Sequence, residues 1–342
     1  MGGQEVQAAL LIRNWRGDPE AEVTFLPNDP VFPNWARALE GIPYLRTVIR
    51  LPLYAITAWR AISRVEVVHI FSASYTSFLL TCFPVWSISR WKRKRVVLNY
   101  HTARRWRQFA TSRIVRFVLN RTQKIVVPST YLARKFEEIG FNVSIVPNII
   151  NDRFQYRART PLKPRILCTR NLSPDYGVDV VIDVFSIVQA QCPEAELCLI
   201  GDGPLRGCLE AKVRSLGISN VQFCGRVAND QMPEWYDRTD IFLNASLLDN
   251  APLSILEAFA CGLPVVTTAA GGIPLMAHHE ETGLLAPVGD RRTLAECVLR
   301  LLRETEFAEK IARQAHEQLA AHRWSVVRLK WLGVYRACAG GA

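Results

Sequence analysis

Short apolar runs typical of buried strands alternate with longer helical runs along the whole chain, and this alternation limits the fold more than any other feature. Strands buried on both faces and separated by helices form parallel sheets covered by helices on either side. We therefore predict an α/β protein with two doubly wound, Rossmann-like domains that face each other across a cleft. The predicted strands are residues 65–71, 95–100, 124–129, 143–148, 165–169, 196–200, 221–225, 240–244, 264–268 and 282–286.

A polar, proline-containing stretch at 153–164 separates the first four strands from the last six and predicts a linker. The length of 342 residues suits an N-terminal domain of residues 1–152 and a C-terminal domain of residues 165–320. The chain is nearly all helical from residue 291 to about 337, and we expect residues 321–342 to pack back on the N-terminal domain. The ligand is expected in the cleft, where the carboxyl ends of the strands meet.

Composition narrows the class of protein further. The chain is 49 % hydrophobic and 21 % charged, which is typical of globular rather than disordered chains. Its nine cysteines include no C-x-x-C pair, which indicates reduced thiols in the cytoplasm. The six histidines form no ligand-spaced cluster with them, so we expect no metal site. Residues 67–89 lack charge over a membrane-spanning length, but their Ser and Thr content and Pro84 favour a strand, a turn and a helix.

Positive charge is concentrated in the first half of the chain. Residues 1–150 hold 21 Lys and Arg against 9 Asp and Glu, whereas residues 151–342 hold 21 against 22. The densest part is residues 89–107, where basic residues and tryptophans are interspersed. A solvated basic face, an anionic membrane and a nucleic acid each suit such a stretch, and we expect the membrane rather than nucleic acid.

Residues 247–266 set two carboxylates, Asp249 and Glu257, eight positions apart around the start of a predicted helix near Pro252. The pattern Ser254-x-x-Glu257 has the form of a capping box, in which Glu257 would have a structural role. The free N–H groups and dipole at the same helix end also favour a bound phosphate. Asp249 could then accept hydrogen bonds from sugar hydroxyls and Glu257 from a ribose, so the two interpretations of Glu257 are compatible.

Three motifs of the second half resemble, in order and spacing, those of the retaining glycosyltransferases of family 4, which have the GT-B fold. They are the G-D-G-P loop and following strand at 199–227, the E-x7-E segment at 247–266 and the G-G turn at 269–290. The first half matches more loosely, through GGQE at residues 2–5, the strand that ends in His101, and VPST at 127–130.

The resemblance implies that a sugar passes with retention from a nucleotide donor in the second domain to an acceptor in the first. Glu257 would bind the ribose, while Asp249 and His101 would be the catalytic residues beside the donor sugar. The donor would be a UDP- or GDP-linked sugar, and the chemical step would need no metal. The donor-binding residues carried over are Arg170, Glu257, Asn250, Ala251, Pro252, Leu253, Gly201, Gly203, Gly2 and Gly3.

The sequence departs from the family pattern at several positions. In the stretch TRNLSPDYG, Tyr176 replaces the usual lysine and Asn171 the usual arginine, while Arg170 lies one position earlier. We expect Arg170 to be a phosphate ligand, although a surface arginine in a loop would have the same sequence. Asp249 replaces the first glutamate of E-x7-E with a shorter acid, and Leu275 replaces the glutamate of the G-G-x-x-E turn.

Three functional hypotheses follow. The leading one is a cytoplasmic glycosyltransferase whose basic first domain docks on the inner face of the plasma membrane to reach a lipid-linked or cell-envelope acceptor. The second is a nucleotide-sugar epimerase with the GT-B fold. The third is a degenerate transferase that serves as a binding module, which Tyr176 favours but the retained Glu257 and His101 disfavour.

One further expectation concerns the start of the chain. In the family, a first strand leads into the glycine-rich loop that Gly2 and Gly3 resemble, and only Met1 precedes them here. The first strand of a doubly wound sheet is central. We therefore expect the first domain to lack this strand and the true start of the gene to lie upstream, unless another segment fills the gap.

Overall fold

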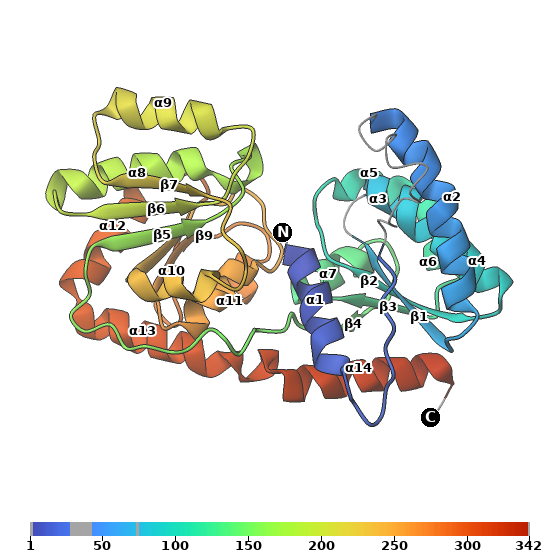
Figure 1. Cartoon of the computed structure of the whole chain (residues 1–342). Helices are drawn as coiled ribbons and strands as arrows, with labels where there is room; N and C mark the ends of the chain where they lie inside the picture. The colour runs from blue at the N-terminus through green and yellow to red at the C-terminus, as the bar shows by residue number, and fades with distance from the viewer. Residues whose placement is uncertain (1–2, 28–42, 73–74, 341–342) are drawn as a thin grey trace. The chain divides into compact units, whose positions relative to one another are not determined.

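The computed structural model describes residues 3–27, 43–72 and 75–340. They fall into two compact units, each built on its own parallel sheet (Figure 1). Unit 1 contains the described residues of 1–6 and 148–326, and unit 2 those of 7–147 and 327–342.

The elements of unit 2, including α1, which begins among the residues of unit 1, are α1 (Gly3–Trp15), α2 (Pro43–Ile62), β1 (Val67–Ser72), α3 (Tyr75–Ser77), the π-helical turn η2 (Phe78–Cys82), α4 (Phe83–Trp91), β2 (Arg95–Tyr100), α5 (Trp106–Thr111), α6 (Arg113–Leu119), β3 (Lys124–Val127), α7 (Thr130–Glu137), β4 (Ser144–Ile145) and most of α14 (Trp324–Ala339). Those of unit 1 are β5 (Arg165–Thr169), η3 (Pro174–Tyr176), α8 (Val178–Gln191), β6 (Glu196–Ile200), α9 (Arg206–Leu216), β7 (Val221–Gly225), α10 (Met232–Arg238), β8 (Ile241–Asn244), α11 (Leu253–Ala260), β9 (Val265–Thr268), η4 (Ile273–Leu275), β10 (Leu284–Ala286), α12 (Arg291–Arg303), α13 (Thr305–Glu317) and η5 (Gln318–His322). These ten strands confirm the ten predicted from the sequence.

The sheet of unit 1 is sandwiched between two apolar layers. Its strand order is β10-β9-β8-β5-β6-β7, and all its pairings are parallel. Alternate side chains of β5 point to opposite faces, so that Ile166 packs in a cluster with α8 and α12 while Leu167 packs with α10 and α11. Strands buried on both faces have to be apolar at every position, which explains why their sequences are continuous apolar runs.

The connections in unit 1 reverse direction at β5. The chain passes from β5 to β6 and β7 on one side and then returns to β8, which pairs with the other side of β5. Such a reversal opens a crevice between the two strand ends, and this is where open α/β sheets bind ligands. The residues that follow β5 and end β8 therefore define the first place to look for a site.

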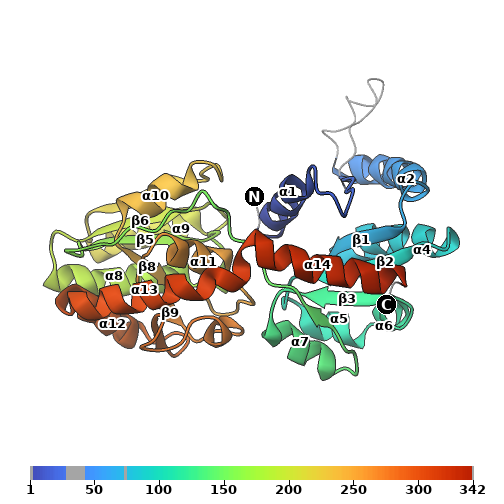
Figure 2. The same cartoon turned by 90° about the horizontal axis from the view of Figure 1, so that it is seen from below.

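The sheet of unit 2 has the order β1-β2-β3-β4, again with parallel pairings. Figure 2 shows α14 lying along these strands. Tyr335 of this helix bonds through its hydroxyl to His69 Nδ1 at 2.9 Å, and Arg95 at the start of β2 donates to Cys338 O at 2.7 Å. Within residues 3–27 and 43–66 the structure contains no strand.

Two segments singled out in the sequence have definite places. The stretch 153–164, predicted to be a linker, is part of unit 1, where Phe154 and Arg159 are both buried. Residues 67–72 form β1, and the helical turns from residue 75 lead into α4, as expected for a strand, a turn and a helix. Of the helices that the structure describes, none combines the length and the apolar character needed to cross a bilayer.

Candidate functional site

Polar side chains meet at the reversal point of the unit 1 sheet. Arg170 directly follows β5, and its Nε donates to Oδ1 of Asn244, the last residue of β8, at 2.8 Å. Asn244 is itself fixed, because its Oδ1 also accepts from the Ser246 hydroxyl and its Nδ2 donates to Thr267 Oγ1, both at 2.8 Å. A permanently charged guanidinium is thus held in the crevice where the fold predicts a ligand.

Arg170 also faces Asp249, with 3.1 Å between Nη2 and Oδ2. Both side chains are largely buried, at 10 % and 16 % exposure. The contact is an ion pair without hydrogen-bond alignment, so that among the described residues neither atom has a hydrogen-bond partner. Buried polar atoms that lack such partners cost free energy, and a ligand that supplies acceptors for Nη2 relieves this cost.

The structure shows how the departure at Tyr176 is accommodated. The guanidinium of Arg170 lies over the Tyr176 ring, 5.5 Å from its centroid, which is within cation–π range. A cation therefore lies beside position 176 even though residue 176 is not a lysine. Arg170 is not a surface arginine in a loop, because its side chain is buried between Tyr176, Asn244 and Asp249.

Gly201 and Gly203 of the G-D-G-P loop allow the loop after β6 to lie against the backbone that carries Arg170. A Cβ on Gly201 would lie 2.0 Å from Arg170 O, and one on Gly203 would lie 2.4 Å from Leu172 O. Gly201 also has a φ of +134°, which L side chains rarely adopt. Backbone hydrogen bonds join the two loops, from Arg170 N to Ile200 O at 2.9 Å and from Leu172 N to Asp202 O at 3.1 Å. The two glycines thus position Arg170, and their contact with a nucleotide stays a prediction.

The start of α11 lies beside this cluster in the sequence and in space. Asp249 caps its own turn by accepting from Asn250 N at 2.8 Å, and its carbonyl accepts from Gly272 N at 2.9 Å. The Ala251 carbonyl accepts from Asn148 Nδ2 at 3.3 Å. Pro252 is the N-cap residue, and no side chain caps the helix. The first N–H groups of α11 therefore stay available to an anion.

The capping-box prediction was wrong. The helix begins at Leu253, so Ser254 lies inside its first turn and Glu257 lies too far along to reach the N-cap residue. The Ser254 hydroxyl is buried and has no hydrogen-bond partner among the described residues. Glu257 therefore does not cap this helix.

Glu257 instead takes part in a buried hydrogen bond between two helices. Its Oε2 accepts from the Tyr236 hydroxyl on α10 at 2.8 Å. Burial raises the pKa of Glu257, while the Tyr236 hydrogen bond and the charge of Arg170 lower it. Sequence reasoning missed Tyr236 and Asn244, because an apolar strand and the helix before it carry no motif that marks a polar role.

His101 follows β2 in unit 2, at the carboxyl end of the sheet. The backbone N–H of His101 donates to Ser72 O at 3.1 Å, and the imidazole ring stacks on Phe71 with 5.6 Å between centroids. Burial lowers the pKa of His101 to about 4, so that the imidazole is neutral at pH 7. His69 of β1 lies between Phe71 and Trp331, each 4.6 Å away between centroids.

Gly3 begins α1, and a methyl group there would touch Leu253 Cδ1 at 3.4 Å, whereas Gly2 lies outside the described residues.

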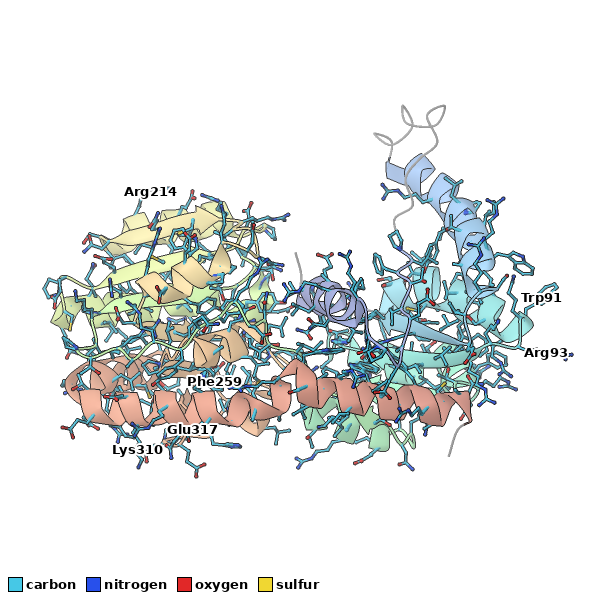
Figure 3. The ribbon with its side chains drawn as sticks, turned by 60° about the horizontal axis from the view of Figure 1, so that its bottom comes forward. Trp91, Arg93, Arg214, Phe259, Lys310 and Glu317 are labelled. Atoms are coloured by element: carbon cyan, nitrogen blue, oxygen red, sulfur yellow. The ribbon has the colours of Figure 1, made fainter. Side chains whose placement is uncertain are left out.

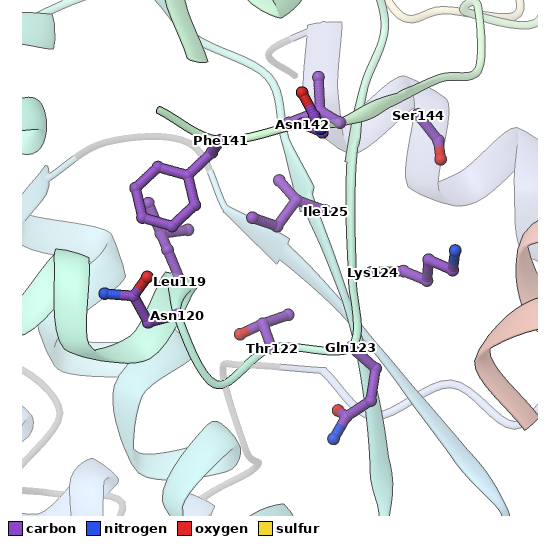
Figure 4. A pocket seen from close by; sticks show the side chains of 10 residues that line it. Leu119, Asn120, Thr122, Gln123, Lys124, Ile125, Phe141, Asn142 and Ser144 are labelled. Atoms are coloured by element: carbon purple, nitrogen blue, oxygen red, sulfur yellow. The ribbon is translucent and has the colours of Figure 1, made fainter. Parts of the chain in front are cut away.

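An open pocket of about 360 Å³ lies in unit 2, beside the first residues of β3 and β4 (Figure 4). It lies at the amino ends of the strands, opposite to the end that carries His101, where doubly wound sheets do not bind ligands. We assign no role to this pocket.

Two family models match the chain and together cover most of it. The model of glycosyltransferase family 4 matches residues 1–154, and that of the group 1 glycosyl transferases matches residues 163–304. The boundary between the two matches falls in the stretch 155–162, inside the predicted linker 153–164. The motifs quoted from the second half all lie within the second match.

Curated relatives match over parts of their length. The chain is 28 % identical over 220 residues to N-acetyl-alpha-D-glucosaminyl L-malate synthase of Bacillus anthracis, with 60 % of this chain and 57 % of that protein covered. It is 31 % identical over 201 residues to the amylovoran biosynthesis glycosyltransferase AmsK of Erwinia amylovora, with 52 % and 48 % covered. The matched regions thus span about half the length of these relatives.

Among solved structures, that of HepE from Anabaena in complex with UDP is similar, with a TM-score of 0.72 at 18 % identity. The likeness covers 83 % of this chain and 82 % of that one, and it shows the fold. The two parallel sheets, the polar reversal point of unit 1 and the two family matches lead to one conclusion. The chain belongs to the family 4 glycosyltransferases and has the GT-B fold.

Proposed function

We propose that the chain transfers a sugar from a nucleoside diphosphate sugar to an acceptor, with retention at the anomeric carbon. The observation that carries the proposal is the position of Arg170 at the reversal point of the unit 1 sheet, in contact with Asn244 and Asp249. The uncapped start of α11 follows Asp249 closely in the sequence. A guanidinium and free helix N–H groups together suit a diphosphate.

The geometry supports a role for each charged group. A sugar that leaves its diphosphate develops positive charge in the ring and negative charge on the leaving phosphate. Arg170 and the N–H groups of α11 stabilise the phosphate, Asp249 accepts from the donor sugar, and Glu257 accepts from the ribose. With this positive charge supplied by the protein, the chemical step requires no metal ion. The neutral imidazole of His101 is a hydrogen-bond partner at the acceptor side.

The donor is a UDP- or GDP-linked sugar in this proposal. Support for a nucleoside diphosphate comes from the fold neighbour HepE, whose structure is a complex with UDP. The acceptor is a lipid-linked or cell-envelope molecule, since positive charge is concentrated in the first half of the chain. The epimerase hypothesis and the binding-module hypothesis compete with this function and predict different products.

A hydrolysis assay over a panel of UDP- and GDP-linked sugars separates the three. A transferase without its acceptor slowly releases the free sugar and the nucleoside diphosphate, an epimerase converts one donor sugar into another, and a binding module does neither. Release of sugar that is lost in the Arg170→Ala variant supports the proposal. Interconversion of donors, or the absence of turnover with every donor in the panel, overturns it. Addition of EDTA leaves the release unchanged if no metal ion takes part.

We also propose that unit 2 docks on an anionic membrane through an aromatic and basic patch. The patch is defined by Trp59 and Arg60 of α2 together with residues 90–93. Trp91 is 79 % exposed and lies edge-to-face with Trp59, 5.8 Å between centroids. Lys92 Nζ lies 4.1 Å above the Trp59 ring. Exposed tryptophans beside cationic groups suit the headgroup region of a bilayer, and the resulting location is peripheral, on the inner face of the plasma membrane.

Flotation with vesicles tests this surface. Wild type should bind vesicles that contain phosphatidylserine at low salt, bind neutral vesicles weakly, and dissociate as salt rises. Figure 3 shows that Arg93 of the patch and Arg214 of unit 1 both project from the ribbon. Arg93→Glu and Trp91→Ala should therefore weaken flotation, whereas the matched control Arg214→Glu should not. Equal loss in Arg93→Glu and Arg214→Glu would leave only a solvated basic face.

A further inference from the structure

Tyr236 contacts the candidate ribose ligand Glu257 from the core of unit 1. The Tyr236 side chain is fully buried, and its hydroxyl lies near three oxygen atoms. These are Glu257 Oε2 at 2.8 Å, Thr169 Oγ1 at 3.1 Å and the Ser254 carbonyl at 3.3 Å. The single phenolic proton goes to the strongest acceptor, which is the carboxylate, and the Thr169 hydroxyl can then donate to the phenol oxygen.

The backbone of Tyr236 is held as firmly as its side chain. The buried Arg159 donates from Nη2 to Tyr236 O at 2.8 Å and from Nε to Thr239 O at 2.9 Å. Its Nη1 donates to the carbonyl of Cys261, the residue that ends α11. One guanidinium therefore joins the carboxyl ends of α10 and α11, the two helices that supply Tyr236 and Glu257. The distance between these helices is fixed independently of any ligand.

This arrangement leaves the two oxygens of Glu257 in different states. Oε2 is occupied by Tyr236, whereas Oε1 receives no hydrogen bond from the residues that the structure describes. A carboxylate bonded on one oxygen cannot rotate freely, so the other oxygen presents its lone pairs in one direction. Such preorganisation improves recognition of a hydroxyl, because the side chain loses little freedom on binding.

We propose that Tyr236 is a positioning residue for ribose recognition: its hydroxyl fixes the Glu257 carboxylate so that the free oxygen accepts from a ribose hydroxyl. The inference rests on the proposed function, because it assumes that Glu257 faces the nucleotide. It adds a residue that touches no substrate and acts through the residue that does. A tyrosine that merely fills the core predicts the same burial but not the same ligand dependence.

The hydrogen bond from Tyr236 also affects the pKa of Glu257, which makes nucleotide binding depend on pH. The titratable groups that interact with Glu257 are Tyr236 from α10, Arg170 after β5 and Cys261 directly after α11. Burial raises the pKa of Glu257, and the Tyr236 hydrogen bond opposes this. The Tyr236→Phe variant loses that opposition, so the pKa of Glu257 rises further. Because the ionised carboxylate is a stronger acceptor than the neutral acid, nucleotide affinity falls as pH drops through this pKa, and in the variant the fall begins at a higher pH.

The test is titration of the full chain with UDP and with 2′,3′-dideoxy-UDP, which lacks both ribose hydroxyls. Tyr236→Phe should lower the affinity for UDP about tenfold, which is the loss expected when a charge-assisted hydrogen bond no longer aligns the acceptor. It should leave the affinity for dideoxy-UDP unchanged. Loss of folded protein in the variant lowers the binding stoichiometry for both probes alike, so the ratio of the two affinities still reports on the ribose.

The matched control is Tyr100→Phe, which removes the hydroxyl of a buried tyrosine that has no hydrogen-bond partner among the described residues. This variant should change neither affinity. Glu257→Gln distinguishes the two levels of the argument: if it binds UDP as wild type does, the assignment of Glu257 to the ribose fails. If Glu257→Gln weakens UDP while Tyr236→Phe does not, or if Tyr236→Phe weakens both probes equally, the positioning role is overturned and the ribose assignment survives.

Discussion

The same arrangement of parallel strands carries two different kinds of strand-end chemistry. In unit 1, the end of β5 bears Arg170, which bonds to Asn244 and pairs with Asp249. In unit 2, the end of β2 bears His101, which stacks on Phe71. The first end is charged and hydrogen-bonded, and the second is neutral and aromatic.

The difference teaches what each strand end can bind. A guanidinium keeps its charge at every physiological pH and suits a diphosphate. Burial lowers the pKa of His101 to about 4 and that of His69 to about 3, so both imidazoles are neutral at pH 7. A neutral imidazole exchanges hydrogen bonds with a hydroxyl, such as that of an acceptor, but does not attract an anion.

The largest expected effect concerns the buried Arg159, which donates hydrogen bonds to the ends of two helices of unit 1. Arg159 is 6 % exposed and donates to the carbonyls of Tyr236, Thr239 and Cys261. Two of these carbonyls also accept from a neutral donor, Tyr236 O from the Thr239 hydroxyl at 3.4 Å and Cys261 O from Arg157 N at 3.3 Å. Arg159→Met should destabilise unit 1 by about 3–5 kcal/mol, because it removes several charge-assisted hydrogen bonds to carbonyls at two helix ends. Hydrogen exchange read peptide by peptide should show faster exchange in α10 and α11, with unit 2 unaffected.

The matched control for this change lies two residues away. Arg157 is half-exposed and pairs with Asp237 at 3.0 Å on the surface. Arg157→Met should cost at most about 1 kcal/mol. Equal destabilisation by the two substitutions would show that the buried arginine is not what holds the helices of unit 1 together.

The next effect tests the charge at the strand end itself. Arg170→Ala should lower donor turnover about 100- to 1,000-fold, the range seen when one group that stabilises developing charge is removed. Because Tyr176 contacts the guanidinium, Arg170→Ala combined with Tyr176→Lys should recover part of the turnover by placing the cation on the neighbouring position. Comparison of kcat/KM for the two variants measures the recovery. A double variant no better than Arg170→Ala would show that the position of the charge, and not only its presence, is essential.

A smaller effect concerns the neutral histidines of unit 2. The folded-state pKa of His69, about 3, lies below the ordinary value of 6.5 because of burial, so the unfolded chain takes up a proton at mildly acidic pH while the folded chain does not. Stability of unit 2 should therefore decrease as pH falls from 6.5 towards 4. His69→Phe keeps the ring between Phe71 and Trp331 but removes the bond to Tyr335, which should cost about 1 kcal/mol at pH 7 and flatten the decrease.

Denaturant unfolding at pH 7.5, 6.0 and 5.0 checks this prediction. Wild type should lose stability over the series, and His69→Phe should lose less of it. A variant whose stability falls as steeply as that of wild type would mean that His69 is not the group that titrates.

Much of the fold and part of the candidate site could be predicted from the sequence, for physical reasons. Strands buried on both faces leave continuous apolar runs, and all ten were found. The G-D-G-P loop was recognisable because only glycine permits the approach of Gly201 to Arg170 O. Asp249 and Glu257 stood out because carboxylates are rare beside an apolar helix.

The rest depended on contacts between segments that are distant in the chain. Arg159 lies in a polar stretch that predicts a linker, and nothing local shows that its guanidinium reaches two helix ends. Tyr236 is one aromatic residue among several in its helix. The capping box failed because α11 begins one residue before Ser254, a difference smaller than sequence patterns can define.

The central claim is that unit 1 binds the nucleotide through its charged strand end, whereas His101 serves the transfer step. Calorimetric titration with UDP of wild type, Arg170→Ala and His101→Ala tests it most directly, with melting temperatures measured on the same samples. The account predicts that Arg170→Ala lowers the affinity for UDP about 10- to 100-fold. His101→Ala should bind UDP as wild type does and lose turnover. UDP affinity that is unchanged in Arg170→Ala, or reduced equally in both variants, would contradict the account.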